Sequence, residues 1–297
     1  MRNIAIFNID SHASALAIQD ILIKHCDEIK LLVLSKPIAA QKKSFLKEVL
    51  NHLKISGLSY VNYLTANFLI HPHMCRAAEI HGKIFNKKPR MRHLETLCTE
   101  LGIQCIRTDN VNSLKIQTLL KEKNIDLVTV YYFDQILKKR LLSAPKKGTI
   151  NFHAAVLPHC RGLHPIIWSI IQNQPFGLSA HTIPDARIDA GPILAQTQVL
   201  SQNERHILSL EQHVNQAGVS LYSDVIQNLD VFMKEAQEQA KGSYFSHPKK
   251  SDLLRLKRQG FQLIRWRSWF KGYFTPSMPL STYKKRTSGF MNFVKNT

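Results

Sequence analysis

The chain has 297 residues, of which 44% are hydrophobic, and its 40 Lys and Arg against 21 Asp and Glu give a formal net charge of +19. This length and hydrophobic fraction predict one large folded domain with an appendage. Apolar runs such as 29–34 and 125–133 are too short to span a bilayer, and the first residues lack the features of a signal peptide, so we expect a cytoplasmic protein.

The first 35 residues predict a buried strand at 4–7, a helix at 13–25 and a second strand at 29–34. Ser35-Lys36-Pro37 ends the second strand. A strand, a helix and a strand in this order form a parallel pair with a right-handed crossover. The chain therefore begins as an α/β fold.

Residues from about 38 to 92 are too many for a simple crossover. The segment is rich in Lys, His and aromatic residues and has helical spacing around 44–53, which predicts an inserted helical pair. His71, His73 and Cys75 alternate within it, but no second ligand cluster accompanies them. The five cysteines of the chain show no CxxC spacing, so we expect neither a metal nor a disulfide framework.

The alternation of helices and strands resumes at about residue 95. The sequence predicts helices at 95–101, 113–123, 137–142 and 163–171, and strands at 104–107, 125–131, 149–153, 178–183 and 192–200. This order predicts an α/β fold with a doubly wound, mostly parallel, Rossmann-like sheet. In such a sheet a ligand binds at the carboxyl ends of the strands.

The chain changes character after about residue 205, so we divide it into a catalytic domain (1–205) and an extension (206–297). A partly amphipathic helix is predicted over 205–240, followed by a basic segment. Residues 249–297 hold twelve Lys and Arg against the single acid Asp252, a net charge of +11, with aromatic residues between them. Such a segment suits RNA phosphates or an anionic membrane face. The alternative is a solubilising tail whose aromatic residues pack back on the domain.

Three polar residues point to acyl transfer. Asn151 and His153 lie two apart at the end of a predicted strand, so they emerge on the same face. Asp189 stands in a turn marked by Ala190-Gly191-Pro192. An amide to donate to an oxyanion, an imidazole to carry a proton and a carboxylate to set its charge suit this chemistry. Each residue alone has an ordinary structural explanation, but the three together favour a catalytic site.

The motifs around these residues resemble a known family. Asn151-Phe152-His153, Leu157-Pro158, Arg161-Gly162 and the string from Ile188 to Ile193 are similar to formyltransferases that use 10-formyltetrahydrofolate. That family includes enzymes acting on methionyl-tRNA, glycinamide ribonucleotide and sugar amines. The resemblance is strong over about 94–200 and implies that Asn151, His153 and Asp189 are catalytic and that the formyl donor is 10-formyltetrahydrofolate. It also implies a pteridine-binding loop made of Phe133, Asp134, Gln135, Ile136 and Leu137.

The acceptor follows less directly. The turn at 8–12 has no glycine, which disfavours glycinamide ribonucleotide. The basic loop that methionyl-tRNA enzymes carry after the second strand is missing, and the region after the long helix is too short for their tRNA-binding barrel. We therefore expect an N-formyltransferase for a sugar amine or another small amine, with methionyl-tRNA as the alternative acceptor. A formyltetrahydrofolate hydrolase and a noncatalytic RNA- or membrane-binding relative are further alternatives.

Overall fold

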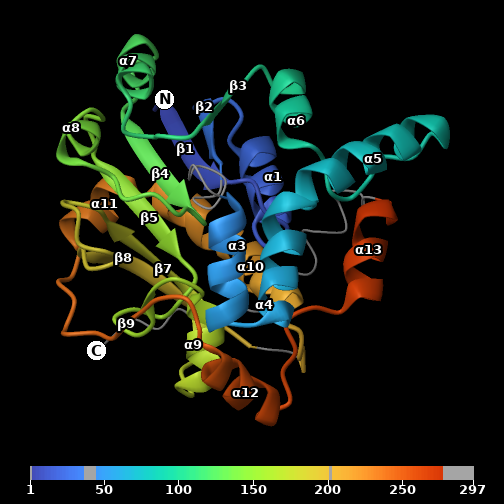
Figure 1. Cartoon of the computed structure of the whole chain (residues 1–297). Coiled ribbons are helices and arrows are strands. Elements are labelled where there is room, and N and C mark those ends of the chain that lie inside the picture. The colour runs from blue at the N-terminus through green and yellow to red at the C-terminus, as the bar shows by residue number, and fades with distance from the viewer. Residues whose placement is uncertain (1, 37–44, 201–202, 277–297) are drawn as a thin grey trace.

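The computed structural model describes residues 2–36, 45–200 and 203–276, and a seven-stranded sheet forms its centre (Figure 1). The strand order is β3-β2-β1-β4-β5-β7-β8, parallel from β3 to β5 and antiparallel at β7 and β8. The strands are β1 (Ile4–Ile9), β2 (Ile29–Ser35), β3 (Gln104–Thr108), β4 (Leu127–Tyr131), β5 (Thr149–His153), β7 (Phe176–Thr182) and β8 (Ile193–Val199). The predicted α/β class and the mostly parallel sheet are confirmed.

The sheet is covered on both faces. Alternate residues of β1 join different cores, with Ile6 in the larger and Phe7 in the smaller. The larger core contains α1 (Ala15–Lys24), α9 (Pro165–Ile171) and α10 (Ile207–Gln227), and the smaller contains α7 (Leu114–Glu122) and α8 (Lys139–Leu142). Because both faces are buried, β1 and β2 read as continuous apolar runs in the sequence, which is why they were predictable.

The insertion holds more helices than the predicted pair. Its described residues form α3 (Phe45–Ile55), α4 (Leu58–Leu64), the π-helical η1 (Thr65–Leu69) and α5 (His71–Ile84). Gly57 separates α3 from α4 with a φ of 90°, and Pro72 stands at the start of α5. The prediction of two helices is therefore too low, because these short helices follow one another with almost no loop between them. The predicted helix at 95–101 corresponds to α6 (Leu94–Glu100).

The prediction of a single helix over 205–240 is wrong. The chain instead forms α10 and α11 (Leu229–Lys234), with Asn228 between them. Asn228 has a non-helical ψ of 30°, and its side-chain amide donates to the carbonyl oxygen of Asp224. This competition of an Asn side chain for the backbone ends the first helix. Residues 235–249 lie outside any helix and contain the short strand β9 (Tyr244–Phe245), which pairs with β6 (Arg161–Gly162).

The described part of the basic extension packs on the domain. After β9 come α12 (Lys250–Arg258) and α13 (Trp266–Phe274), and α13 lies beside α5 (Figure 1). Phe261, Trp269 and Tyr273 are buried, as the packed-tail alternative expected, whereas Trp266 and Phe270 are exposed. Residues 277–297, which hold the last cations and aromatic residues of the basic segment, lie outside the described part. No helix among the described residues combines the length and hydropathy needed to cross a membrane.

Candidate active site

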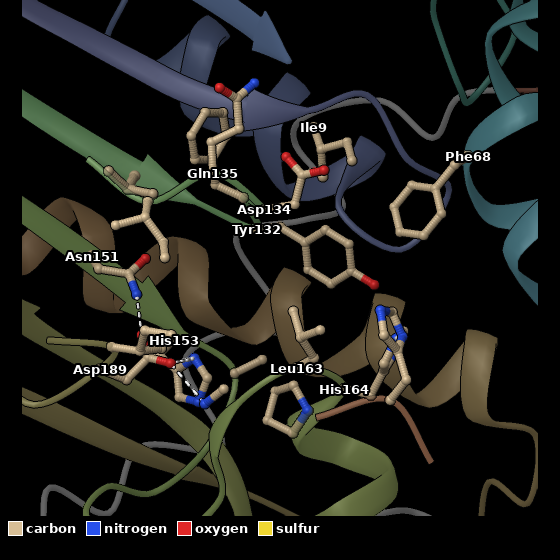
Figure 2. Close-up of a pocket in the computed structure, with 18 of the residues that line it drawn as sticks. Ile9, Phe68, Tyr132, Asp134, Gln135, Asn151, His153, Leu163, His164 and Asp189 are labelled. Atoms are coloured by element: carbon tan, nitrogen blue, oxygen red, sulfur yellow. Dashed lines mark hydrogen bonds and ion pairs between the residues drawn. The ribbon is translucent and has the colours of Figure 1, made fainter. Parts of the chain in front are cut away.

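The three residues predicted to be catalytic lie together at the carboxyl end of β5 (Figure 2). The Asn151 amide nitrogen donates to the Oδ1 atom of Asp189 over 2.9 Å. The Nδ1 atom of His153 lies 3.5 Å from the Oδ2 atom of the same carboxylate. Asp189 reaches them from the loop between β7 and β8. Because β7 ends at Thr182, opposite Ile150 near the start of β5, this loop has to extend back along β5 to bring Asp189 to Asn151 and His153. One carboxylate therefore joins the amide and the imidazole.

The turn that carries Asp189 is held by several contacts. Asp189 has a φ of 47°, a left-handed backbone conformation that is uncommon for residues other than glycine. The Gly162 amide donates to its Oδ2 atom over 2.9 Å. Gly191 allows a close approach, since an added Cβ would lie 2.0 Å from the carbonyl oxygen of Thr182. The Arg-Gly and Ala-Gly-Pro motifs of the sequence thus position the carboxylate.

Gln239 is a positioning residue that sequence reasoning missed. Its amide nitrogen donates to the carbonyl oxygens of Asp189 at 3.1 Å and Gly191 at 2.6 Å. Its Oε1 atom accepts two hydrogen bonds from the guanidinium of Arg161. Gln239 lies 50 residues beyond Asp189 in a segment predicted as helix, so no local pattern marked it.

His181 also joins the cluster, although it was not predicted to be catalytic. It pairs with Asn151 across β5 and β7. Its Nδ1 atom lies 2.8 Å from the carbonyl oxygen of Thr182 and takes the donor role there, which leaves Nε2 to accept the Asn151 amide at 3.1 Å. Asn151 thus gives its two amide hydrogens to Asp189 and His181. The strand register, which the sequence did not reveal, was the signal needed to find this residue.

The hydrogen bonds fix the charges of the cluster. Burial alone raises the pKa of the Asp189 carboxyl, but the charge of His153 and the hydrogen bond from the Gly162 amide lower it, and the pKa lies well below its ordinary value. His153 faces an acceptor at each nitrogen, with the Cys160 carbonyl oxygen 2.9 Å from Nε2 and Asp189 near Nδ1. Two acceptors require two N–H donors, so this geometry suits the imidazolium form.

A cavity of about 510 Å³ opens beside this cluster. Its lining includes the whole loop predicted to bind the pteridine, namely Phe133, Asp134, Gln135, Ile136 and Leu137. Ser35 ties this loop down, because its hydroxyl donates to Asp134 over 2.9 Å and accepts from the Gln135 amide over 2.7 Å. Further lining comes from α3, α4 and η1 of the insertion and from His164 and His247. Figure 2 shows Phe68 of η1 and His164 beside the cavity. The insertion therefore forms part of the cavity.

A buried polar network stands behind the insertion wall. The Tyr60 hydroxyl lies 2.6 Å from Nε2 of His164 and 2.7 Å from Nδ1 of His247. The Tyr63 hydroxyl donates to Glu211, which is 1% exposed. Burial raises the pKa of Glu211 to about 8, although hydrogen bonds from two tyrosines oppose the shift. Among the described residues no group of three or more His, Cys, Asp or Glu is arranged to hold a metal ion.

We expect the Glu211→Gln variant to remove a pH dependence of stability. A carboxyl whose pKa rises from 4.5 to about 8 on folding keeps its proton in the folded state while the unfolded state loses it. The folded state then loses up to about 1.4 kcal/mol for each pH unit between these values as the pH rises. Urea unfolding of both proteins between about pH 5 and 8 measures this slope. Equal slopes would contradict the protonated state of Glu211.

Comparison with known proteins gives a family match and several relatives. A family model described as "Formyl transferase" matches residues 38–226. The methionyl-tRNA formyltransferase of Geobacter metallireducens is 29% identical over 162 residues, which cover 54% of this chain and 52% of that protein. The chain thus spans about half the length of the curated relatives it matches.

Solved structures share the fold. A sugar N-formyltransferase from Shewanella sp FDAARGOS_354 superimposes with a TM-score of 0.51 at 20% identity, covering 87% of this chain and 88% of that one. A phosphoribosylglycinamide formyltransferase from Bacillus halodurans gives a TM-score of 0.50 at 20% identity, covering 77% of this chain and 95% of that one.

Proposed function

We propose that this chain, which belongs to the formyl transferase family, moves a formyl group from 10-formyltetrahydrofolate to an acceptor amine. The observation that carries the proposal is the cluster of Asn151, His153 and Asp189 on the wall of a 510 Å³ cavity, in which Asn151 donates to Asp189 and His153 lies 3.5 Å from it. That volume lies within the range of small-ligand sites. The family match covers these three residues.

In the proposed reaction the amine nitrogen first bonds to the formyl carbon, and the bond from that carbon to the folate nitrogen then breaks. The amine loses a proton and the folate nitrogen gains one. An oxyanion develops on the formyl oxygen between these steps, and the His153 imidazolium stabilises it and serves in proton transfer. Asn151 is the second oxyanion donor, and one of its two amide hydrogens leaves its present acceptor for the substrate. Asp189 keeps the imidazolium charged and oriented.

The loop of residues 133–137 is the proposed donor site. Its polar side chains are held by Ser35, which leaves the loop backbone to pair with the donors and acceptors of a pterin. Ile136 is 55% exposed on the cavity side and Leu137 is buried, so an apolar surface for the ring lies next to that backbone. Asp134, where the family commonly has Gly or Met, is accommodated by its bond to Ser35.

A sugar amine or another small amine is the proposed acceptor. Among the described lining residues Arg187 is the one Lys or Arg, and it pairs with Asp185 over 2.9 Å. An acceptor with several phosphates would therefore need to keep them outside the cavity. The described part of the extension packs on the domain as β9, α12 and α13. Methionyl-tRNA is the alternative acceptor, and the curated relatives, which are methionyl-tRNA formyltransferases, favour it.

Two measurements on the full chain test this function. The protein is expected to bind 5-formyltetrahydrofolate, and absence of binding at millimolar ligand would remove the donor assignment. A transfer assay then compares small amines and amino-sugar nucleotides with methionyl-tRNA. A small amine is expected to give an affinity nearly independent of salt, whereas tRNA held by six or more phosphate contacts would lose about 10³-fold between roughly 50 and 200 mM salt. Robust turnover of methionyl-tRNA would overturn the preference for a small amine.

A further inference from the structure

The end of α5 and the helix α13 lie side by side (Figure 1). We call the exposed side chains of residues 80–90 and 264–276 the α5–α13 face. The two segments are bonded directly, because the Arg90 amide donates to the carbonyl oxygen of Thr275 over 3.0 Å. Pro89 and Pro276 form an antiparallel bridge at the same place. The ring centroids of His81 and Phe274 lie 5.3 Å apart.

Large apolar side chains are exposed on this face. On α5 and the residue after it, Ile80 is 61% exposed, Ile84 71% and Phe85 57%. On α13, Trp266 is 48% exposed and Phe270 55%. Rings link the two groups, since His81 contacts Phe85 at 4.5 Å and Phe274 contacts Phe270 at 5.1 Å. Exposed apolar side chains gathered on two neighbouring helices mark a contact surface.

The charge of this face is entirely positive. Neither 80–90 nor 264–276 contains an Asp or Glu. Glu100 feels the charge of Lys88 and Lys83, but its carboxylate is already bonded to Arg92. The exposed cations of the face form no ion pair with any residue in the described ranges; they are Lys83, Lys87, Lys88, Arg90, Arg265, Arg267 and Lys271. The surface therefore matches an anionic partner that also accepts apolar side chains.

We infer that the α5–α13 face docks on an anionic lipid bilayer, with both helices lying in the interface. Aliphatic side chains decide between a bilayer and RNA. Bases stack on aromatic rings and guanidinium groups, but Ile80 and Ile84 offer them no stacking surface. The same side chains enter the boundary between headgroups and acyl chains, while neighbouring Lys and Arg bind the anionic headgroups. Trp266 and Phe270 belong to the residue types that such interfacial helices use.

Vesicle flotation with the full chain tests this inference. The protein is expected to bind vesicles of equimolar phosphatidylcholine and phosphatidylglycerol and not vesicles of phosphatidylcholine alone. The triple variant Lys83→Gln, Lys87→Gln, Lys271→Gln is expected to bind about 100-fold more weakly, at roughly fivefold for each charge lost. The double variant Ile84→Ser, Phe270→Ser removes two large side chains from the interface and is expected to weaken binding at least ~10-fold.

Helix α7 provides the matched control, because it also carries an exposed leucine and exposed lysines. The variant Leu114→Ser, Lys115→Gln, Lys121→Gln changes side chains of the same kinds away from the face, and Leu114 is 72% exposed. This control is expected to bind vesicles as the parent does. Circular dichroism establishes that all variants remain folded.

Three results would overturn the inference. The first is absence of binding to the anionic vesicles. The second is vesicle binding that neither variant weakens, which would place the contact elsewhere on the chain. The third is binding of single-stranded polyuridylate that the lysine variant weakens while the vesicles stay unbound, which would make the face an RNA-binding surface.

Discussion

Asp189→Asn is expected to lower formyl transfer at least ~10²-fold while leaving the affinity for 5-formyltetrahydrofolate within a few-fold. The carboxylate accepts hydrogen bonds from the Asn151 amide and the Gly162 amide and lies 3.5 Å from His153. An Asn in this place removes the negative charge and turns an NH₂ group toward one of these donors. The imidazolium of His153 then has no counterion.

His153→Ala is expected to cause a loss of the same order, because it removes the proton carrier itself. The two losses are expected to be far from additive when combined, since the carboxylate acts through the imidazole. A pH profile separates this role from a merely structural one. Asp189→Asn is expected to move the pH dependence of turnover, whereas a general loss of folding would lower turnover equally at every pH.

The matched control is Asp230→Asn on α11. Asp230 is also an ion-paired aspartate, bound to Lys147 and Arg2, but it lies on the exposed surface. Its variant makes the same chemical change and is expected to keep full turnover. A fully active Asp189→Asn would remove the proposed orienting role of the carboxylate and leave His153 to act without it.

The sequence predicted those parts of the site that local patterns carry. Asn151 and His153 were predicted because two residues on one strand face the same side, and Asp189 because of the turn and the family motif that contain it. His181 and Gln239 could not be found in this way. His181 depends on the antiparallel register of β5 and β7, and Gln239 on a contact across 50 residues. Both are properties of the folded chain.

The fold shows the same division. Buried parallel strands such as β1 and β2 were predicted because residues covered on both faces form unbroken apolar runs. Helix ends were predicted less well, since Asn228 ends α10 by bonding its own helix, which apolar spacing does not reveal. The sequence could not distinguish a binding tail from a packed one, because the composition of the extension suits both. In the folded chain Trp269 and Tyr273 are packed in the core, whereas Trp266 and Phe270 are exposed.

Tyr273→Ala is expected to lower the free energy of unfolding by roughly 3–5 kcal/mol, the range for a large aromatic side chain removed from a core. Tyr273 is fully buried, and its hydroxyl lies 3.0 Å from Nδ1 of His12 and 2.7 Å from Nδ1 of His71. These partners belong to the β1–α1 turn and to α5, so one side chain joins three segments that are far apart in the sequence. Urea unfolding measures the loss.

Two further variants of α13 separate the contribution of the buried ring from that of its hydroxyl and from that of an exposed ring. Tyr273→Phe keeps the ring and leaves His12 and His71 without the hydroxyl, at an expected cost of about 1–3 kcal/mol. Phe270→Ala, on the exposed side of the same helix, is expected to cost less than about 1 kcal/mol because its side chain is 55% exposed. If Tyr273→Ala were as stable as Phe270→Ala, α13 would not be part of the folded core.

Because the extension is held in this way, deleting the chain from Lys249 would remove buried Leu256, Phe261, Trp269 and Tyr273 and unfold the domain. Surface substitutions such as Lys271→Gln are therefore the way to separate binding by the extension from its part in the fold.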